Sequence, residues 1–489
     1  MSALDPPFGH NRPTPRRLAP WLFVMALTGL LTVLTTAQAF DRYREFRASW
    51  PWDQAWYNQW YWALTRGDGR ITVRPMAGFG MEKPTVWKIW YLTPGRFALA
   101  PLYRLFPDPR TLLVIDNVVF WLVVPAAFGL VRGETDSEAL ALSAAALVPL
   151  TPLLWPLAWN DFRELHLGLP FILWAVRGVR ERDVRRASWG VGGMLACRQE
   201  FAVVVAILAL LPPRRPEGWR RSLRWAAVLG ASGVVWFLVV YPCYLVWAEG
   251  PNAPASYFRQ FFGPKATPLE TLATATELLA IGLGAWVVLA LGAPRVAWLA
   301  LPLAWSLSSG QWALRYLSTV QWHEVRYTIP VVGMGLAAGL IGYARLGNWL
   351  LSRRGGVGTL GVVWLAAALW GGLGLSDLAG RVARAPHPIA RGEARAVWKW
   401  IGRVGPDDGV IADYAVTTPL SSRRWLYSYH FRENLPEDFP RLAPEIRWAF
   451  LRSGGPNPLV FLRQGFTFVH RGPGMTILHR ESLSRDPPP

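Results

Sequence analysis

Long hydrophobic runs recur along the whole chain and are separated by short polar segments. A helix needs about 20 apolar residues to cross the hydrocarbon layer of a membrane, and most of these runs approach that length. The pattern therefore predicts a mainly α-helical, polytopic membrane bundle of about 9–11 hydrophobic segments. The runs lie near residues 20–40, 111–131, 138–158, 165–179, 187–197, 201–212, 225–247, 270–292, 296–310, 327–344 and 357–376.

Two consecutive runs, 187–197 and 201–212, are too short to cross a membrane alone. They meet at the sequence CRQE, residues 197–200, and both of their outer flanks are rich in arginine. Half-length helices are tolerated at membrane depth where they line a cavity. We therefore expect a re-entrant pair of short helices with Arg198 and Glu200 at its tip.

The positive charges follow the same pattern as the runs. The chain has 51 Lys and Arg residues against 32 Asp and Glu residues, which gives a formal net charge of +19. Arginines cluster in the short connections 177–186, 214–224 and 345–354, and the positive-inside rule places such connections in the cytoplasm. Membrane topology thus accounts for the basic excess, and we expect no nucleic-acid partner.

The same rule divides the membrane part of the chain. Residues 1–18 form a basic cytoplasmic N-terminus, and residues 19–376 form the polytopic transmembrane domain, which we expect in a bacterial inner (plasma) membrane. The first run follows basic residues and has no clear small-residue cleavage site, so we expect a retained signal anchor. The first extracytoplasmic loop, 41–110, is large, and shorter loops near 160, 255 and 315 lie on the same side.

From residue 377 the chain changes character. A Pro-Asp-Asp-Gly turn precedes a short β-like run at 410–412, and residues 457–480 alternate like strands that break at 463–465 and 471–474. A helix is predicted before them, at 391–403. Residues 377–489 therefore predict a small extracytoplasmic α/β domain.

The stretch 49–69, SWPWDQAWYNQWYWALTRGDG, has five tryptophans and two tyrosines around Asp53. Aromatic belts occur at membrane interfaces, whereas aromatic rings near a carboxylate can also form the wall of a carbohydrate site. Tyr57 and Tyr61 are candidates for stacking on a sugar beside Asp53. We expect three tryptophans, four residues apart on a helix, to face the membrane interface: Trp52, Trp56 and Trp60.

Ionisable groups beside spanning segments are costly and are functional candidates for that reason. Each cluster also has a structural alternative. Asp53 could cap the helix that it begins, Arg198 and Glu200 could form a structural ion pair, and His323 could be an interfacial residue. The convergence of the clusters on one face favours a site. On the predicted outer side they are Asp53, segment 91–103, segment 160–166, Arg198 with Glu200, and segment 321–327.

The order and spacing of these clusters resemble a family of predicted membrane proteins called domain of unknown function 2079, which is related to the GT-C class of membrane glycosyltransferases. The resemblance covers about 42–345. The motifs that carry it are Asp53 followed by Asn58-Gln59, Trp62 and Gly67; Tyr91-Leu92-Thr93-Pro94 followed by Ala100–Tyr103; Asp161-Phe162-Arg163; Arg198-Gln199-Glu200; and His323 with Pro330.

Three positions depart from the pattern of the family. Tyr91 and Arg163 stand where the pattern has histidines, although His166 lies close to Arg163, and Asn58 stands where it has a second acid. If the family's histidines bind a metal or a phosphate, this chain does so differently, or its activity has diverged or been lost.

The resemblance implies an integral-membrane glycosyltransferase that moves a sugar from a polyprenyl-phosphate donor to an extracytoplasmic glycan, lipid or protein acceptor. Asp53 would be the general base, and Arg198, supported by Arg163, would bind the departing phosphate. Membrane lipid is the other expected partner, no cofactor is certain, and a divalent cation is an open alternative. The residues expected to contact substrate or phosphate are Arg198, Arg163, Asp161, His166, Glu200, His323, Gln59, Tyr57, Trp62 and Tyr91.

Two other classes of function stay open. A transporter also places charged residues on broken helices at mid-depth, but the chain has no pseudo-symmetric halves. A non-catalytic envelope protein that displays the C-terminal domain would account for the missing histidines. Turnover of a lipid-linked sugar by the purified protein would separate these classes.

Overall fold

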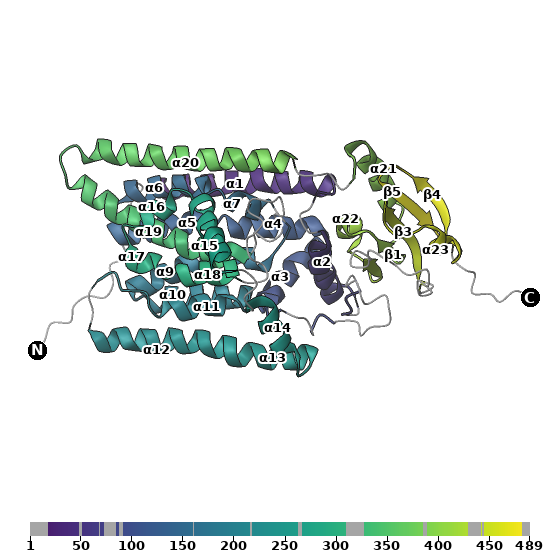
Figure 1. Cartoon of the computed structure of the whole chain (residues 1–489), viewed down its shortest axis with the longest axis horizontal. Helices are drawn as coiled ribbons and strands as arrows, with labels where there is room; N and C mark the ends of the chain where they lie inside the picture. Colours follow the sequence, from purple (N-terminus) through teal and green to yellow (C-terminus); the bar gives the residue numbers. More distant parts are fainter. Residues whose placement is uncertain are drawn as a thin grey trace, which may run out of the picture.

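The computed structural model describes residues 18–47, 51–67, 69–72, 85–87, 91–159, 161–215, 218–262, 267–309, 327–384, 389–428, 442 and 445–481. A helical bundle occupies one end of an elongated molecule, and a small domain with a β-sheet occupies the other (Figure 1). The mainly helical fold with a small C-terminal α/β domain is therefore as predicted.

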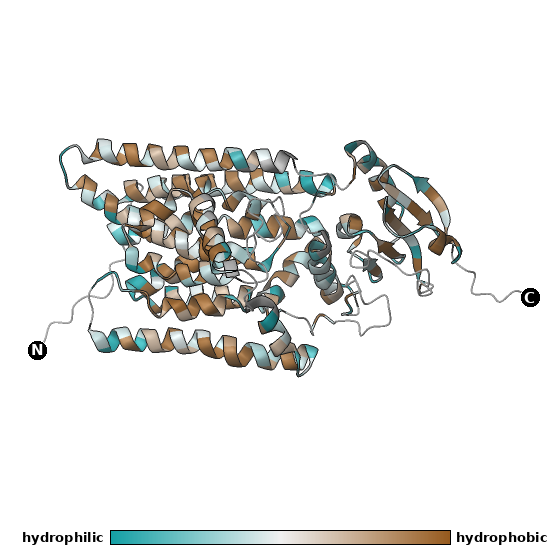
Figure 2. Ribbon diagram, viewed as in Figure 1, coloured by the Kyte–Doolittle hydropathy of each residue, from teal (hydrophilic) through white to brown (hydrophobic). Residues whose placement is uncertain are grey.

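Within these ranges, five helical stretches are long and apolar enough to cross a membrane. Two of them are central, with 78 and 89% of the span buried, whereas the other three are peripheral, with 17 to 28% buried. The peripheral helices consist mainly of hydrophobic residues (Figure 2). Many of their large apolar side chains are exposed, as on lipid-facing helices. The central stretches are α4–α5 (Pro109–Phe120 and Val123–Thr135) and α19 (Ile329–Leu351); the peripheral ones are α1 (Ala19–Arg44), α20 (Gly356–Arg384), and α12, η4 and α13 (Trp219–Val235, Trp236–Val240 and Tyr241–Glu249).

Three runs that we predicted to be single spans are broken into short helices. Proline lacks the backbone N–H that continues a helix, and Pro149 and Pro152 lie at the first break. Gly284 has a positive φ of 57° at the second break. The pieces are α6 (Glu138–Leu147), η3 (Val148–Leu150) and α7 (Leu154–Ala158); α15 (Pro268–Glu277), η5 (Leu278–Gly282) and α16 (Trp286–Ala290); and α17 (Pro294–Ala297) and α18 (Leu301–Ser309).

The predicted pair of short helices is confirmed. After α8 (Glu164–Leu167) and α9 (Leu169–Glu181), the chain forms α10 (Val184–Cys197) and α11 (Phe201–Leu208). Arg180, at the end of α9, accepts a hydrogen bond at its carbonyl from Arg214 N (2.8 Å) and donates one from Nη1 to the Pro212 carbonyl (2.9 Å). The chain after α11 thus returns to the end where α10 begins, and Arg198 and Glu200 lie at the tip between the two helices.

Three further helices lie at the end of the bundle nearest the sheet: α2 (Pro51–Thr65), α3 (Gly95–Leu105) and α14 (Ala253–Phe262). The last of them corrects the loop that we expected near residue 255. Helix α2 lies between the bundle and the C-terminal domain (Figure 1).

The C-terminal domain has a five-stranded sheet in the order β2-β1-β3-β5-β4. Strand β1 pairs in parallel with β2 and β3, and the pairs β3–β5 and β4–β5 are antiparallel. The predicted helix and the first strand are confirmed, whereas 459–462 is a helix and not part of a strand. The elements are α21 (Arg391–Ile401), β1 (Gly409–Ala412), α22 (Tyr414–Thr417), η7 (Thr418–Leu420), β2 (Leu426–Ser428), β3 (Ile446–Arg452), α23 (Leu459–Leu462), β4 (Thr467–Arg471) and β5 (Met475–His479).

Helix α21 attaches this domain to the end of α1. Trp398 Nε1 donates a hydrogen bond to the Arg44 carbonyl (2.8 Å), and its ring stacks on Phe46 with the centroids 5.2 Å apart. Arg391 and Glu45 form an ion pair at 3.3 Å. The domain therefore rests on the first spanning helix as well as on α2.

Candidate active site

Asp53 lies in the first turn of α2, two residues after the helix begins at Pro51. An acidic residue in the first turn is favoured by the helix dipole. Its Oδ2 atom forms an ion pair with Arg163 Nη1 at 2.5 Å. The carboxylate is therefore held by a residue 110 positions away in the chain, from the segment just before α8.

Arg163 joins two acids and an aromatic ring. Its Nη2 atom lies 3.6 Å from Asp161 Oδ2, and its guanidinium carbon lies 5.6 Å from the centroid of the Tyr57 ring. The side chain is buried. Three of the predicted site residues, Asp161, Arg163 and Tyr57, are thus brought together beside Asp53.

Arg198, at the tip between α10 and α11, lies on another part of the same cluster. Its Nη2 atom pairs with Glu200 Oε1 at 3.0 Å, which is the ion pair of the structural alternative, and its Nη1 atom donates a hydrogen bond of 3.4 Å to Tyr57 Oη. The guanidinium also stacks on Tyr91, 3.6 Å from the ring centroid. Tyr91, one of the residues that replace a family histidine, therefore packs directly on the proposed phosphate ligand.

A third arginine completes the surroundings of Tyr57. Arg96 forms a buried ion pair with Glu164, and its guanidinium carbon lies 5.5 Å from the Tyr57 ring centroid. Gly95 permits this arrangement because a Cβ atom there would lie 2.9 Å from the Ala196 carbonyl oxygen at the end of α10. Arg96 was not singled out from the sequence, although an arginine within an apolar helical segment is a usable signal.

Two acids of the cluster, Asp53 and Glu200, are more exposed than its arginines. The side chains of Asp53 and Glu200 are 14 and 16% exposed, whereas those of Arg163 and Arg198 are each 2% exposed. A ligand that approaches the cluster would therefore meet carboxylates first, with the guanidinium groups behind them.

Several polar atoms of the cluster have no hydrogen-bond partner among the described residues. They include Arg96 Nη1 and Nη2, Arg198 Nε and Glu200 Oε2. Leaving a buried donor or acceptor unbonded costs about 1–3 kcal/mol, and such atoms often bind water or a ligand. Burial raises the pKa of Tyr57 above its ordinary value, partly offset by Arg198 and Arg163, so the phenol stays neutral and able to donate.

His166 pairs with a buried acid, Asp116, which interacts with Arg163 and Asp161 of the cluster. Its Nδ1 atom lies 3.0 Å from Asp116 Oδ2, and both side chains are fully buried between α8 and α4. Asp116 was not identified from the sequence. Among the described residues, no group of three or more His, Cys, Asp or Glu side chains is placed to hold a metal ion.

Gln59 lies away from the Asp53 cluster and binds the C-terminal domain. Its Nε2 atom donates to Thr72 Oγ1 (2.9 Å) and to the Arg423 carbonyl (3.1 Å), and its Oε1 atom accepts from Thr72 N (2.9 Å). Asn58 Nδ2 donates to Ser421 Oγ at 2.8 Å. Burial lowers the pKa of the Arg423 guanidinium to about 10.

The helical period explains this separation. At 100° per residue, Asn58, Gln59 and the half-buried Trp62 lie on the opposite side of α2 from Asp53 and Tyr57. The structure does not bring Gln59 or Trp62 to the cluster. Predicted residue His323 lies outside the described residues.

The predicted interfacial stripe of tryptophans is wrong. Trp56 and Trp60 are only 4 and 1% exposed, and each ring lies 5.1 Å from the guanidinium carbon of Arg96. They share the face of α2 that carries Asp53, so this face cannot also meet the membrane interface. Tyr61 is buried as well, packed on Tyr103 and Phe162, and the side chain of Trp52 lies outside the description.

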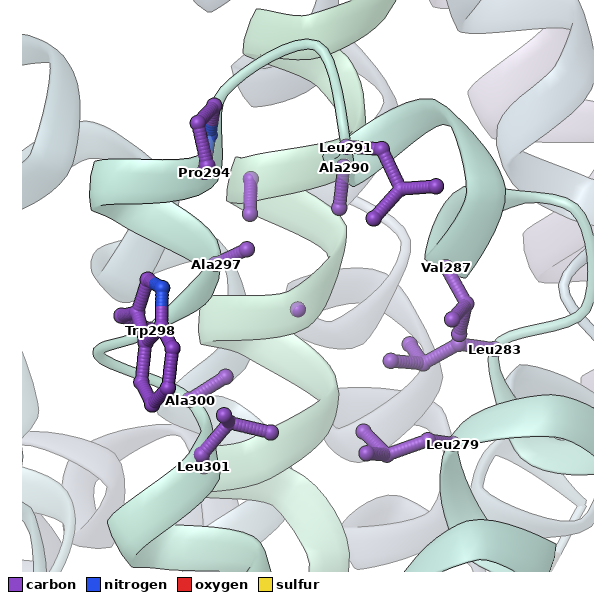
Figure 3. A pocket seen from close by; sticks show the side chains of 12 residues that line it. Leu279, Leu283, Val287, Ala290, Leu291, Pro294, Ala297, Trp298, Ala300 and Leu301 are labelled. Atoms are coloured by element: carbon purple, nitrogen blue, oxygen red, sulfur yellow. The ribbon is translucent and has the colours of Figure 1, made fainter.

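A separate, apolar cavity of about 300 Å³ lies against α19 (Figure 3). Leucine, valine, alanine and tryptophan side chains line it, and Gly335 and Ala338 form its wall on α19. Tyr327, two residues before the start of α19, interacts electrostatically with Tyr91 and Arg198. Because Gly335 is eight residues further along, the cavity begins roughly 12 Å along the helix from the polar cluster.

This fold is similar to that of a solved membrane protein. The chain superimposes on ArnT from Cupriavidus metallidurans bound to undecaprenyl phosphate with a TM-score of 0.56 and 11% identity, covering 96% of this chain and 99% of that one. The apo state of the same protein gives a TM-score of 0.51 and 12% identity, covering 95 and 100%. The expected GT-C-like fold is thus confirmed.

A comparison with family models also assigns the chain to a family. The model of the family described as predicted membrane protein (DUF2079) matches residues 49–452. The chain therefore belongs to this family of membrane proteins. No curated protein matches it in sequence.

Proposed function

We propose that the protein is a membrane glycosyltransferase that moves a sugar from a polyprenyl-phosphate donor to an acceptor on the extracytoplasmic side. The observation that carries the proposal is the pairing of two accessible acids, Asp53 and Glu200, with two buried arginines, Arg163 and Arg198, around Tyr57. The similarity of fold to a protein solved with undecaprenyl phosphate supports the class of donor.

Asp53 is the proposed general base. The hydroxyl group of an acceptor is a poor nucleophile, and a positioned carboxylate that takes its proton accelerates the attack on the anomeric carbon by about 10²–10⁴-fold. The ion pair with Arg163 fixes the orientation of this carboxylate, while its partial exposure leaves it within reach of an acceptor. Asp161 in turn holds Arg163 from behind.

Arg198 is the proposed ligand of the departing phosphate. A guanidinium binds phosphate and carboxylate oxygens with the same geometry, so a phosphate would replace Glu200 at Arg198 Nη2. This exchange would also use the unbonded Nε atom. Glu200 thus occupies the place of the phosphate in the unloaded protein, and donor binding releases it.

The apolar cavity beside α19 suits the lipid part of the donor. A polyprenyl chain that leaves a phosphate at Arg198 would run into the hydrocarbon region, and the cavity begins within two or three helical turns of Tyr327. Its lining has no charged side chain among the residues described there. Isoprene units would bury apolar surface in it.

The test is turnover by the purified full-length chain, reconstituted with a panel of polyprenyl-phosphate sugars, of the wild type and Asp53→Asn. Asparagine is nearly isosteric but cannot accept a proton near neutral pH, so we expect at least about a hundredfold loss of rate. Asp41→Asn is the matched control, because Asp41 is exposed and pairs only with Arg44 among the described contacts. Full activity of a folded Asp53→Asn protein would contradict the assignment of the base.

A further inference from the structure

A groove of about 320 Å³ lies between α10 and α12, apart from the Asp53 cluster. Apolar side chains form most of its surface, among them Val184 and Val191 of α10 and Val228 and Leu229 of α12. Val184 and Val228 are 66 and 64% exposed, so the groove opens to the surroundings of the bundle. In a membrane those surroundings are lipid.

The groove exists because the first turns of α12 are not in close contact with the bundle. Close contact begins only later in the helix, at Gly233. At Gly233, a Cβ atom would lie 2.5 Å from the Ala202 carbonyl oxygen and from Ala206 N, so α12 and α11 are in backbone contact there. The preceding turns of α12, from Arg224 to Ser232, face α10 across the groove instead. The space is therefore built into the packing of the helices.

One end of the groove is strongly basic. Arg224 lines it directly, and the guanidinium carbon of Arg182 lies 5.2 Å from the ring centroid of Trp225, another lining residue. Figure 2 shows the start of α12 as hydrophilic and the rest of the helix as mainly hydrophobic. Further arginines adjoin this end at the starts of the two helices: Arg185, Arg186, Arg220 and Arg221.

Among the described residues, the nearby acids pair with only some of the arginines at this end. Glu181 pairs with Arg177 (2.9 Å) and with Arg186, and Asp183 pairs with Arg186 at 3.3 Å. In the part of the chain that the structure describes, Arg185 and Arg224 have no ion pair with a carboxylate. An excess of positive charge thus remains at the mouth of an apolar groove.

We propose that this groove binds an anionic phospholipid, with one acyl chain along the valine-lined surface and the phosphate against Arg224 and its neighbours. Basic pockets between spanning helices bind anionic headgroups. A soluble anion would make no use of the apolar wall, and a zwitterionic lipid would gain less from the arginines. The site is separate from the proposed transfer reaction and does not depend on it.

The experiment measures lipid binding to the detergent-purified, delipidated full-length chain by native mass spectrometry. Phosphatidylglycerol and phosphatidylcholine with identical acyl chains are compared, together with glycerol phosphate as the headgroup alone. We expect phosphatidylglycerol to bind at least about tenfold more tightly than phosphatidylcholine, and the headgroup alone to bind far more weakly. Equal binding of the two lipids, or of phosphatidylglycerol and glycerol phosphate, would overturn the proposal.

Three variants locate the site. Arg224→Ala should weaken binding of phosphatidylglycerol about fivefold, which corresponds to about 1 kcal/mol, without weakening phosphatidylcholine. Ser188→Phe, which fills the groove, should weaken the binding of both lipids. Arg354→Ala is the matched control, because Arg354 is exposed at the same end of the bundle, between α19 and α20 (Figure 1). If Arg224→Ala and Arg354→Ala behave alike, the lipid is not bound in this groove.

Discussion

The two sides of helix α2 differ in charge and in how fully their polar groups are hydrogen-bonded. On one side, Asp53 and Tyr57 face arginines, and several polar atoms have no protein partner among the described residues. On the other side, Asn58 and Gln59 donate hydrogen bonds to neutral hydroxyl and carbonyl groups of the C-terminal domain. A side with charged groups and unused hydrogen-bonding capacity suits a ligand, whereas a side with neutral, bonded groups suits permanent packing.

The difference between the two sides of α2 also divides the residues of one sequence motif. The spacing that joins Asp53 to Asn58, Gln59 and Trp62 suggested a single set of site residues, but the helical period divides them between the two sides. The motif therefore combines a residue proposed for chemistry with residues that fix the helix carrying it.

The largest effect should come from breaking the charged side at Arg198. We expect Arg198→Ala to lower turnover by about 10²-fold or more, because the departing phosphate loses its cation. Arg198→Lys keeps the charge but loses the planar fork, so its loss should be smaller. The measurement is the rate and the KM for the lipid-linked donor. Equal losses for the two variants would mean that a positive charge alone does not support turnover at this position.

The Arg198 variants need a control for Glu200, whose carboxylate loses its ion-pair partner. Removing Arg198 leaves Glu200 without its partner, which alone can destabilise the protein. The double variant Arg198→Ala/Glu200→Ala removes both charges. If it recovers the unfolding temperature but not the turnover, the loss reflects phosphate binding and not the orphaned acid.

On the neutral side, the expected effect is on stability. Gln59→Ala leaves the Thr72 N–H and the Arg423 carbonyl without their hydrogen bonds to Gln59 in a buried interface, which should cost about 1–3 kcal/mol of the free energy of unfolding. Turnover per folded molecule should change less than threefold. Thermal unfolding and activity are measured on the same sample, and Thr72→Ser, which keeps the hydroxyl, is the conservative control. A loss of turnover without a loss of stability would show that Gln59 takes part in the reaction and does not only attach the C-terminal domain.

The smallest effect should come from Tyr57, where the charged side meets the aromatic rings. Tyr57→Phe removes one hydrogen bond of 3.4 Å to Arg198 and keeps the packing against Phe162. We expect a loss of turnover below about tenfold, since one hydrogen bond to a charged group contributes about 1.5–3 kcal/mol at most and this one is long. A loss as large as that of Arg198→Ala would show that the phenol contacts the substrate itself.

The sequence predicted features that depend on local pattern. Run length and flanking arginines predicted the two short helices that meet at Arg198, and the Arg198–Glu200 pair follows from two positions that are close in sequence. The helix Arg391–Ile401 and the strand Gly409–Ala412 were likewise readable from local periodicity.

Features that depend on tertiary contact were not predictable in this way. The pairing of Asp53 with Arg163 joins segments 110 residues apart, and nothing local specifies it. Trp56 and Trp60 have the spacing of an interfacial stripe, but spacing cannot tell whether a helix side meets lipid or a buried guanidinium. Arg96 was overlooked because its partner, Glu164, comes from a distant segment.

The attachment of the C-terminal domain has a mechanical consequence. Trp398 attaches the domain to the end of α1, and a separate patch that includes Ser421 and Ser422 attaches it to α2 and to the Pro107 carbonyl. A rigid body attached at one point can pivot in any direction, whereas a body that is also attached over a separate patch cannot. Any swing of the domain thus requires that the hydrogen bonds of at least one attachment be released.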